Sequence, residues 1–199
     1  MTNRKTGRDK ASAEKRYIKA QELLDDSFRL GLKVLESGFL PDFIVGIWRG
    51  GTPVGIAVQE LFEHNGISSD HIAIRTSSYE GIEQRGKIIR VHGLNYIVQN
   101  ANAEHRLLIV DDVYDTGLSI KAVIDSLLRR SRSNTPRDIR IATVFFKPGN
   151  NLTERRPDYY VHETDKWLVF PHELKGLSPE EIARHKPEIA RIIGRRKAK

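Results

Sequence analysis

Three aspartates within five positions, Asp111, Asp112 and Asp115, follow the apolar run "LLIV" at 107–110. Carboxylates this close repel one another, so a bound partner must offset the cost of keeping them together. Carboxylate oxygens suit sugar hydroxyls or a hydrated Mg²⁺. The segment therefore predicts a site for such a ligand at the mouth of a buried strand.

The turn that follows the aspartates has the features of a phosphate site. Thr116-Gly117-Leu118-Ser119 leads into the helix-like segment at 120–130. A helix start presents unpaired N–H groups and a partial positive charge, which suit a phosphate. Gly117 allows close approach of the backbone, and the hydroxyls of Thr116 and Ser119 can donate hydrogen bonds. Acids beside an amide nest predict a sugar-phosphate ligand; the alternative is a turn whose aspartates only cap the helix.

Apolar periodicity predicts the elements that must position these residues. Short strands are expected at 43–47, 71–76, 87–91, 107–110, 139–146, 158–163 and 167–170. Helices are expected at 17–35, 54–65 (with Thr52 as N-cap and Pro53 at the first position), 94–104, 118–130 and from Ser178, where a capping box begins, with a break or new start at Pro187. The alternation predicts an α/β fold with a mainly parallel sheet and helices on both faces.

Polar or glycine-rich groups stand at the ends of three of these strands. Asp111 and Asp112 end one strand, Arg49 to Gly51 end a second, and Lys147 ends a third. Ligands of such sheets bind beyond the carboxyl ends of the strands, so these residues are expected to form one site.

Composition bounds the class of protein. A chain of 199 residues without cysteine excludes disulfides, thiolate catalysis and Cys-ligated metal. No apolar run approaches the roughly 20 residues that cross a bilayer, and the N-terminus lacks a signal-like core, so we expect a cytoplasmic protein. The net charge is +7, but residues 1–16 and 191–199 carry +9 between them and 17–190 carry −2. The basic ends are interpreted as solvated tails rather than a specific nucleic-acid site.

The segment "LLIVDDVYDTGLS" (107–119) resembles the motif of the type I phosphoribosyltransferases, which bind phosphoribosyl pyrophosphate (PRPP). The resemblance extends over roughly 39–175. It implies that Asp111 and Asp112 hold the ribose hydroxyls, partly through Mg²⁺. It also implies that 115–119 (Asp115, Thr116, Gly117, Leu118 and Ser119) wrap the 5′-phosphate.

Two further loops are similar to loops of that family. "GIWRGG" (46–51) resembles the pyrophosphate loop, in which Arg49-Gly50 matches a peptide that can adopt the cis form. "TSSYEGIEQRG" (76–86) resembles the flexible loop of the purine members, whose Ser-Tyr pair, here Ser78 and Tyr79, closes over PRPP. Such a lid would exclude water from a reactive ribosyl cation. Composition alone would indicate a plain hairpin loop.

Base-site residues resemble those of the 6-oxopurine enzymes. Lys147 matches the lysine directed at O6, and "DKWLVFPHE" (165–173) resembles the C-terminal hood. There Trp167 would stack on the purine, the Leu168 backbone would meet its exocyclic group, and Glu173 would help to hold Mg²⁺. Asp115 would act as general base or hold the proton of N7. The sequence departs from the family pattern at Tyr114, Leu118, His172 and Glu173, and the last two cloud base preference most.

Together these features predict a Mg²⁺-dependent 6-oxopurine phosphoribosyltransferase of purine salvage. It would join hypoxanthine, guanine or xanthine to PRPP, with pyrophosphate released, in a homodimer or homotetramer without membrane or specific nucleic-acid partners. We expect a single domain over 1–199, with a core at about 39–175, a helical extension at 1–38 and a helical, basic tail at 176–199. The alternatives are a PRPP-binding regulator that contacts nucleic acid, which the basic tails favour, and a pyrimidine phosphoribosyltransferase, which Lys147 with Trp167 disfavours.

Overall fold

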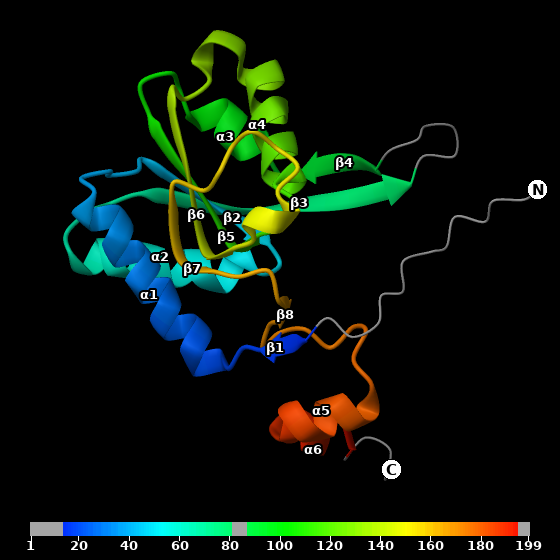
Figure 1. Cartoon of the computed structure of the whole chain (residues 1–199). Coiled ribbons are helices and arrows are strands. Elements are labelled where there is room, and N and C mark those ends of the chain that lie inside the picture. The colour runs from blue at the N-terminus through cyan, green and yellow to red at the C-terminus, as the bar shows by residue number, and fades with distance from the viewer. Residues whose placement is uncertain (1–13, 81–86, 195–199) are drawn as a thin grey trace, which may run out of the picture. The chain divides into compact units, whose positions relative to one another are not determined.

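A six-stranded sheet with the order β4-β3-β2-β5-β6-β7 forms the centre of one of two units, Gln21–Asp165 (Figure 1). The computed structural model describes residues 14–80 and 87–194. The strands are β2 (Phe43–Trp48), β3 (Asp70–Glu80), β4 (Lys87–His92), β5 (Arg106–Tyr114), β6 (Asp138–Phe146) and β7 (Tyr159–Glu163). Every pairing is parallel except that of β3 with β4. The predicted α/β fold with a mainly parallel sheet is confirmed.

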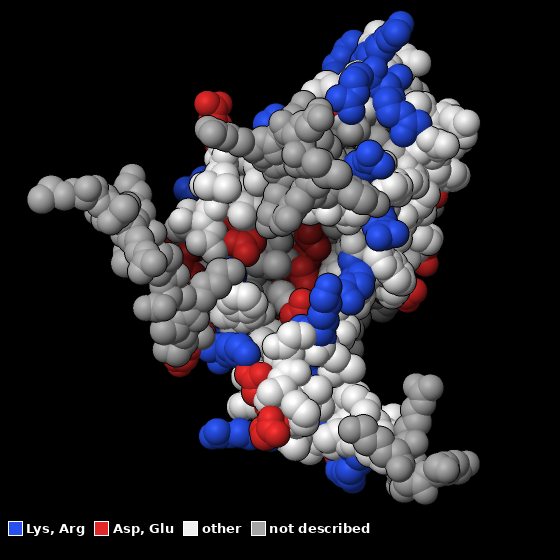
Figure 2. Space-filling view, turned by 90° about the vertical axis from the view of Figure 1, so that its right-hand side faces the viewer, with Lys and Arg blue, Asp and Glu red and all other residues white. Residues whose placement is uncertain are grey.

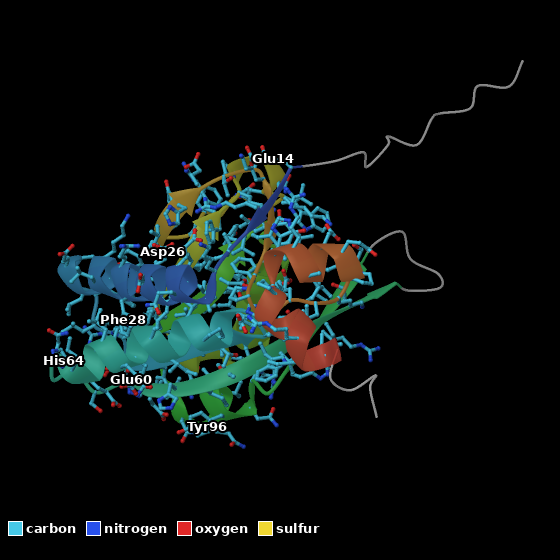
Figure 3. The ribbon with its side chains drawn as sticks, turned by 90° about the horizontal axis from the view of Figure 1, so that it is seen from below. Glu14, Asp26, Phe28, Glu60, His64 and Tyr96 are labelled. Carbon is cyan, nitrogen blue, oxygen red and sulfur yellow. The ribbon has the colours of Figure 1, made fainter. Side chains whose placement is uncertain are left out.

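Helices α1 (Ala20–Glu36) and α2 (Gly51–His64) cover one face of the sheet. Figures 1 and 3 show them side by side. Gly31 permits this packing, since a Cβ there would lie 2.9 Å from Leu61 of α2. A Cβ on Gly55 of α2 would lie 3.7 Å from the Cα of Gly46 of β2, so this helix and strand are in ordinary van der Waals contact.

The opposite face is covered by α3 (Asn95–Asn100) and α4 (Leu118–Ser131). Side chains of α4, including Ile120, Val123 and Leu127, belong to one buried cluster with Val45 of β2 and Ile109 of β5. Alternate residues of a strand point to opposite faces, so β2 and β5, buried on both, are apolar throughout their central parts. This packing fixes the start of α4 at the carboxyl end of β5.

The second unit is formed by the two ends of the chain, of which 14–20 and 166–194 are described. Strand β1 (Lys15–Tyr17) pairs in parallel with β8 (Trp167–Val169), and two short helices follow, α5 (Pro179–His185) and α6 (Pro187–Gly194). The predicted capping box at Ser178 and Glu181 is present, and Pro187 begins the second helix. The expectation of a single domain over 1–199 stays a prediction.

Several boundaries differ from the predicted ones. Tyr17 lies in β1 rather than in the first helix, because 15–17 pair with β8. Thr52 lies within α2, whose N-cap is Gly50, so the predicted cap is wrong by two positions. Helix α3 ends at Asn100, four residues early, because Ala101 is extended. No helix in the described part of the chain is long and apolar enough to cross a membrane.

Candidate functional site

The acidic pair projects from strand β5 itself. The strand continues four residues past the predicted end at 110, because Asp111 pairs with Thr143 and Tyr114 pairs with Phe146 of β6. Asp112 is buried, and its N–H donates to Asp111 Oδ1 at 2.9 Å. The two carboxylates therefore lie within β5, near the carboxyl end of the sheet. The sequence predicted them at this end of the strand.

Burial and the neighbouring Asp112 carboxylate raise the pKa of Asp111 well above its usual range, while the N–H groups of Asp112 and Gly51 oppose the change. Crowded negative charge of this kind favours a bound cation or a hydroxyl donor. Carboxylate oxygens are also the ligands that Mg²⁺ prefers, and it commonly takes one or two with substrate phosphates and water. Asp111 and Asp112 therefore fit the expected Mg²⁺. No group of three or more His, Cys, Asp or Glu in the described ranges could hold a metal by itself.

The turn between β2 and α2 lies directly against this pair. A Cβ on Gly50 would lie 1.8 Å from Asp112 Oδ2, and a Cβ on Gly51 would lie 2.4 Å from the carbonyl oxygen of Val110. Only glycine fits at such a distance, so the two glycines bring the backbone onto the acids. The cis peptide is Trp48–Arg49, so the prediction of a cis bond at Arg49-Gly50 was wrong by one position. Because Gly50 has no side chain, it leaves room for the Asp112 carboxylate.

The turn after β5 brings backbone N–H groups to the same end of the sheet. Gly117 has φ +74° and is the N-cap of α4, and as a glycine it has no side chain that could cap the helix. The Leu118 N–H lies 3.4 Å from Thr116 Oγ1, and Ser119 follows in the first turn of the helix. Backbone N–H groups of a helix start suit an anion, and the phosphate contacts predicted for this turn stay predictions.

The Tyr114 side chain packs against this turn at Gly117. It is 2% exposed, and a Cβ on Gly117 would lie 2.5 Å from its hydroxyl. The hydroxyl lies 2.8 Å from Thr153 Oγ1 and donates to the carbonyl of Arg155 at 2.9 Å. The tyrosine that departs from the family pattern therefore ties the phosphate turn to the loop after β6. The sequence shows that Tyr114 differs from the family pattern, but it does not show the contact with Thr153, 39 residues away.

Lys147 and Asp115 come together at the end of β6. The lysine is 8% exposed, and its Nζ lies 3.8 Å from Asp115 Oδ2. Asn150 Nδ2 donates to the other carboxylate oxygen, Oδ1, at 2.7 Å. Sequence reasoning missed Asn150; its signal was the "KPGN" turn directly after a strand-end lysine.

The segment expected to form a lid is partly a strand. β3 runs to Glu80, and 75–80 pair with 87–92 of β4, so the expectation that the strand ends at 76 and gives way to a loop was wrong for 77–80. Pairing with β4 extends β3 past the end of β2, whose last partner in β3 is Arg75. Ser78 is exposed on this extension and Tyr79 follows it, while 81–86 lie outside the described residues. The lid roles of Ser78 and Tyr79 stay predictions.

The predicted hood residues belong to the second unit. Trp167 is 52% exposed and Leu168 is buried, both on β8. Glu173 Oε2 accepts the N–H of Phe170 at 3.0 Å, and the Glu173 N–H donates back to the carbonyl of Phe170 at 3.0 Å. The predicted base contacts of Trp167 and Leu168 and the metal contact of Glu173 stay predictions.

Basic side chains surround the other end of α4. Arg129 and Arg130 occupy its last turn, where cations complement the helix dipole. Figure 2 shows Lys and Arg side chains gathered at the upper end of the face in view, the end at which α4 finishes. The first turn of α4 has no acidic residue, and the nearest carboxylate in sequence before it is Asp115, two positions before the N-cap.

Comparison with known proteins gives one family match. Residues 15–177 match the model of the phosphoribosyl transferase domain. The purine phosphoribosyltransferase of Pyrococcus horikoshii is similar in structure, with 28% identity, a TM-score of 0.63 and coverage of 82% of this chain and 97% of that one.

Two other solved structures share the fold at lower identity. A hypothetical protein of Neisseria gonorrhoeae with bound ppGpp has 16% identity and a TM-score of 0.70, with 91% and 98% coverage. The xanthine-guanine-hypoxanthine phosphoribosyltransferase of Helicobacter pylori has 19% identity and a TM-score of 0.60, with 88% and 99% coverage.

Proposed function

Since the chain belongs to the phosphoribosyl transferase domain family, we propose that it transfers the phosphoribosyl group of PRPP to a 6-oxopurine base. The single observation that carries the proposal is the convergence at one sheet end of the Asp111–Asp112 pair, the amide turn at Gly117 and the Lys147–Asp115 pair. These groups suit a ribose, a phosphate and a purine respectively. The neighbour from Pyrococcus horikoshii, a purine phosphoribosyltransferase, supports a purine substrate.

PRPP would be held mainly by backbone and by the acidic pair. The N–H groups at the start of α4 would take the 5′-phosphate, and Asp111 and Asp112 would accept hydrogen bonds from the ribose hydroxyls. The Arg49–Gly51 turn, which lies against Asp112, would take the pyrophosphate. Asp111 and Asp112 would hold Mg²⁺, which when bound neutralises negative charge on the departing pyrophosphate.

The reaction is a displacement at C1 of the ribose. The C1–oxygen bond to pyrophosphate breaks with its electron pair leaving on oxygen, and a bond from C1 to a purine nitrogen forms. The positive charge that develops on the ribose is stabilised by the fixed carboxylates beside it. The purine loses one proton, which Asp115 accepts or holds at the imidazole edge of the base.

Lys147 gives the reason for preferring a 6-oxopurine. The residue is 8% exposed, and its Nζ lies 3.8 Å from Asp115 Oδ2, which is beyond hydrogen-bond distance, so the ammonium still needs a close acceptor. A 6-oxopurine presents an acceptor at O6, whereas adenine presents an amino group, so donor would meet donor. Sites built on a polar contact reject analogues that lack the partner by large factors.

The test is an ultraviolet assay with PRPP, Mg²⁺ and a panel of purine and pyrimidine bases. We expect nucleotide formation with at least one 6-oxopurine and a kcat/KM for adenine lower by about 10³-fold or more. Lys147→Gln should narrow that gap, chiefly through poorer use of 6-oxopurines, because an amide can donate or accept. Equal use of adenine and guanine by the wild type would refute the assigned base class. PRPP binding without turnover on any base would instead favour the regulatory alternative.

A further inference from the structure

The short turn after β6 holds the Asp115 carboxylate from two sides. Asn150 Nδ2 donates to Oδ1 at 2.7 Å, whereas the ammonium of Lys147 lies 3.8 Å from Oδ2. The two oxygens are therefore not equivalent: an amide that does not titrate fixes one, and the other faces the buried lysine. A carboxylate held at one oxygen cannot rotate freely about its terminal torsion, which is otherwise broad.

The turn that carries Asn150 is itself fixed. Pro148–Asn150 form a single 3₁₀ turn, and the Gly149 N–H donates to Asp165 Oδ1 at 3.0 Å. A Cβ on Gly149 would lie 2.9 Å from that oxygen, so the turn and Asp165 are in close contact. Two residues on, the Leu152 N–H donates to the carbonyl of Thr116 at 3.0 Å, which joins the same loop to the phosphate turn.

We propose that Asn150 is a positioning residue, which orients Asp115 so that Oδ2, beside Lys147, faces the proton of the bound purine. This inference rests on the proposed function. A correctly aimed proton acceptor lowers the barrier through orientation, and an acceptor free to rotate forfeits that gain. Asn150 does not meet the reacting atoms; it acts through Asp115. The turn also explains why Lys147 and the aspartate, 32 positions apart, are placed as one unit for base recognition.

The first test separates positioning from binding. Asn150→Ala removes the hydrogen bond and should lower kcat roughly 10-fold, the effect of losing one hydrogen bond to a charged group. The KM for PRPP should stay within about 2-fold, because the ribose and phosphate contacts lie elsewhere. Asn134→Ala, an exposed asparagine in the 3₁₀ turn that follows α4, is the matched control and should change neither quantity. An unchanged kcat in Asn150→Ala would overturn the inference.

The second test asks whether Asn150 acts through Asp115. In an Asp115→Asn background, Asn150→Ala should change kcat by less than about 2-fold, because the group it orients is already lost. A 10-fold loss in both backgrounds would show a general structural effect and would refute the positioning role. Unfolding temperature and the PRPP-induced rise in that temperature should match the wild type in each variant, which reports that the fold and the PRPP site are intact.

A third readout does not depend on turnover. The side-chain NH₂ resonances of Asn150, observed by ¹⁵N NMR, should move on Asp115→Ala and stay in place on Asp125→Ala, an aspartate of α4 that pairs with Lys121. If the wild type transferred phosphoribose to no base, the proposed function would fail while this measurement still tested the contact. If the chemical shifts of the Asn150 NH₂ group do not change on Asp115→Ala, the inference is overturned independently of turnover.

Discussion

At the scale of single residues, the roles proposed for the aspartates at the end of β5 can be tested separately. Asp112 is buried beside Gly50. Asp115 directly follows β5, accepts a hydrogen bond from Asn150 and lies near Lys147. Under the proposed function, Asp112→Asn would remove a ribose contact that is present in both ground and transition states, so we expect weaker PRPP binding to be its main effect. Asp115→Asn should leave PRPP binding nearly intact, because the phosphate turn is mostly backbone, and should lower kcat by about 10²-fold.

Titration calorimetry with PRPP and Mg²⁺, together with initial rates, distinguishes the two variants. The reverse result, in which Asp115→Asn weakens PRPP binding and spares kcat, would exchange the assignments. Asp125→Ala serves as the control, because this exposed aspartate of α4 pairs only with Lys121 among the described residues and should leave both quantities unchanged.

At the scale of elements, one buried carboxylate joins α1 to the edge strand β7. Asp26, labelled in Figure 3, is 1% exposed and contacts His162 Nε2 at 2.7 Å and Arg29 Nη1 at 2.6 Å. Asp26→Ala should lower the free energy of unfolding by about 2 kcal/mol, because two hydrogen bonds to a charged group are lost. The loss should not be larger, because Arg29 and His162 are partly exposed and can bind water instead. Denaturant unfolding measures this. Asp25→Ala, the exposed neighbour, should change it by no more than about 0.5 kcal/mol.

Helix α5 is joined to β1 through an ionised glutamate. The hydrogen bond from Lys15, the Ser178 N–H and the Tyr17 hydroxyl lower the pKa of Glu181 from 4.5 to about 2. A lowered folded-state pKa stabilises the fold above the unfolded value and ceases to do so as pH falls through the folded one. The protection factors of the β1 amides, which correct for the intrinsic pH dependence of exchange, should therefore fall between about pH 4.5 and 2. Glu181→Gln should remove most of this dependence, and Glu188→Gln, an exposed glutamate of α6, should keep it; the opposite pattern would locate the titration elsewhere.

The helices and strands also show which parts of the fold could be predicted from the sequence. Apolar alternation predicted the sheet and α4, since buried strands and an amphipathic helix leave a periodic record. It could not predict β1, because three residues with little apolar character take their conformation from pairing with β8, about 150 positions later. The extension of β3 beyond 76 was missed for the same reason: its polar residues are ordered by pairing with β4.

In the site, too, residues in local motifs could be predicted and residues that depend on long-range contacts could not. Motif residues such as Asp111, Gly117 and Lys147 were found from type and order at strand ends, and the structure brings them to one end of the sheet. Asn150 and Tyr114 were not, because their contacts join loops 35 to 41 positions apart, which no local pattern records. Long-range polar contacts of this kind depend on the finished fold.

At the scale of the whole molecule, ligand binding should appear as stability. Because Asp111 and Asp112 repel each other, PRPP and Mg²⁺ should bind together and strongly, whereas PRPP in excess chelator should bind weakly. A ligand at 100 times its Kd stabilises the native state by about 2.7 kcal/mol, which for a chain of this size corresponds to a rise in Tm of roughly 5–10 °C. Differential scanning fluorimetry of the full chain measures the rise. In the Asp111→Asn/Asp112→Asn double variant the difference between Mg²⁺ and chelator should vanish. An equal rise for the wild type in Mg²⁺ and in chelator would mean that the acidic pair meets the ribose without a cation.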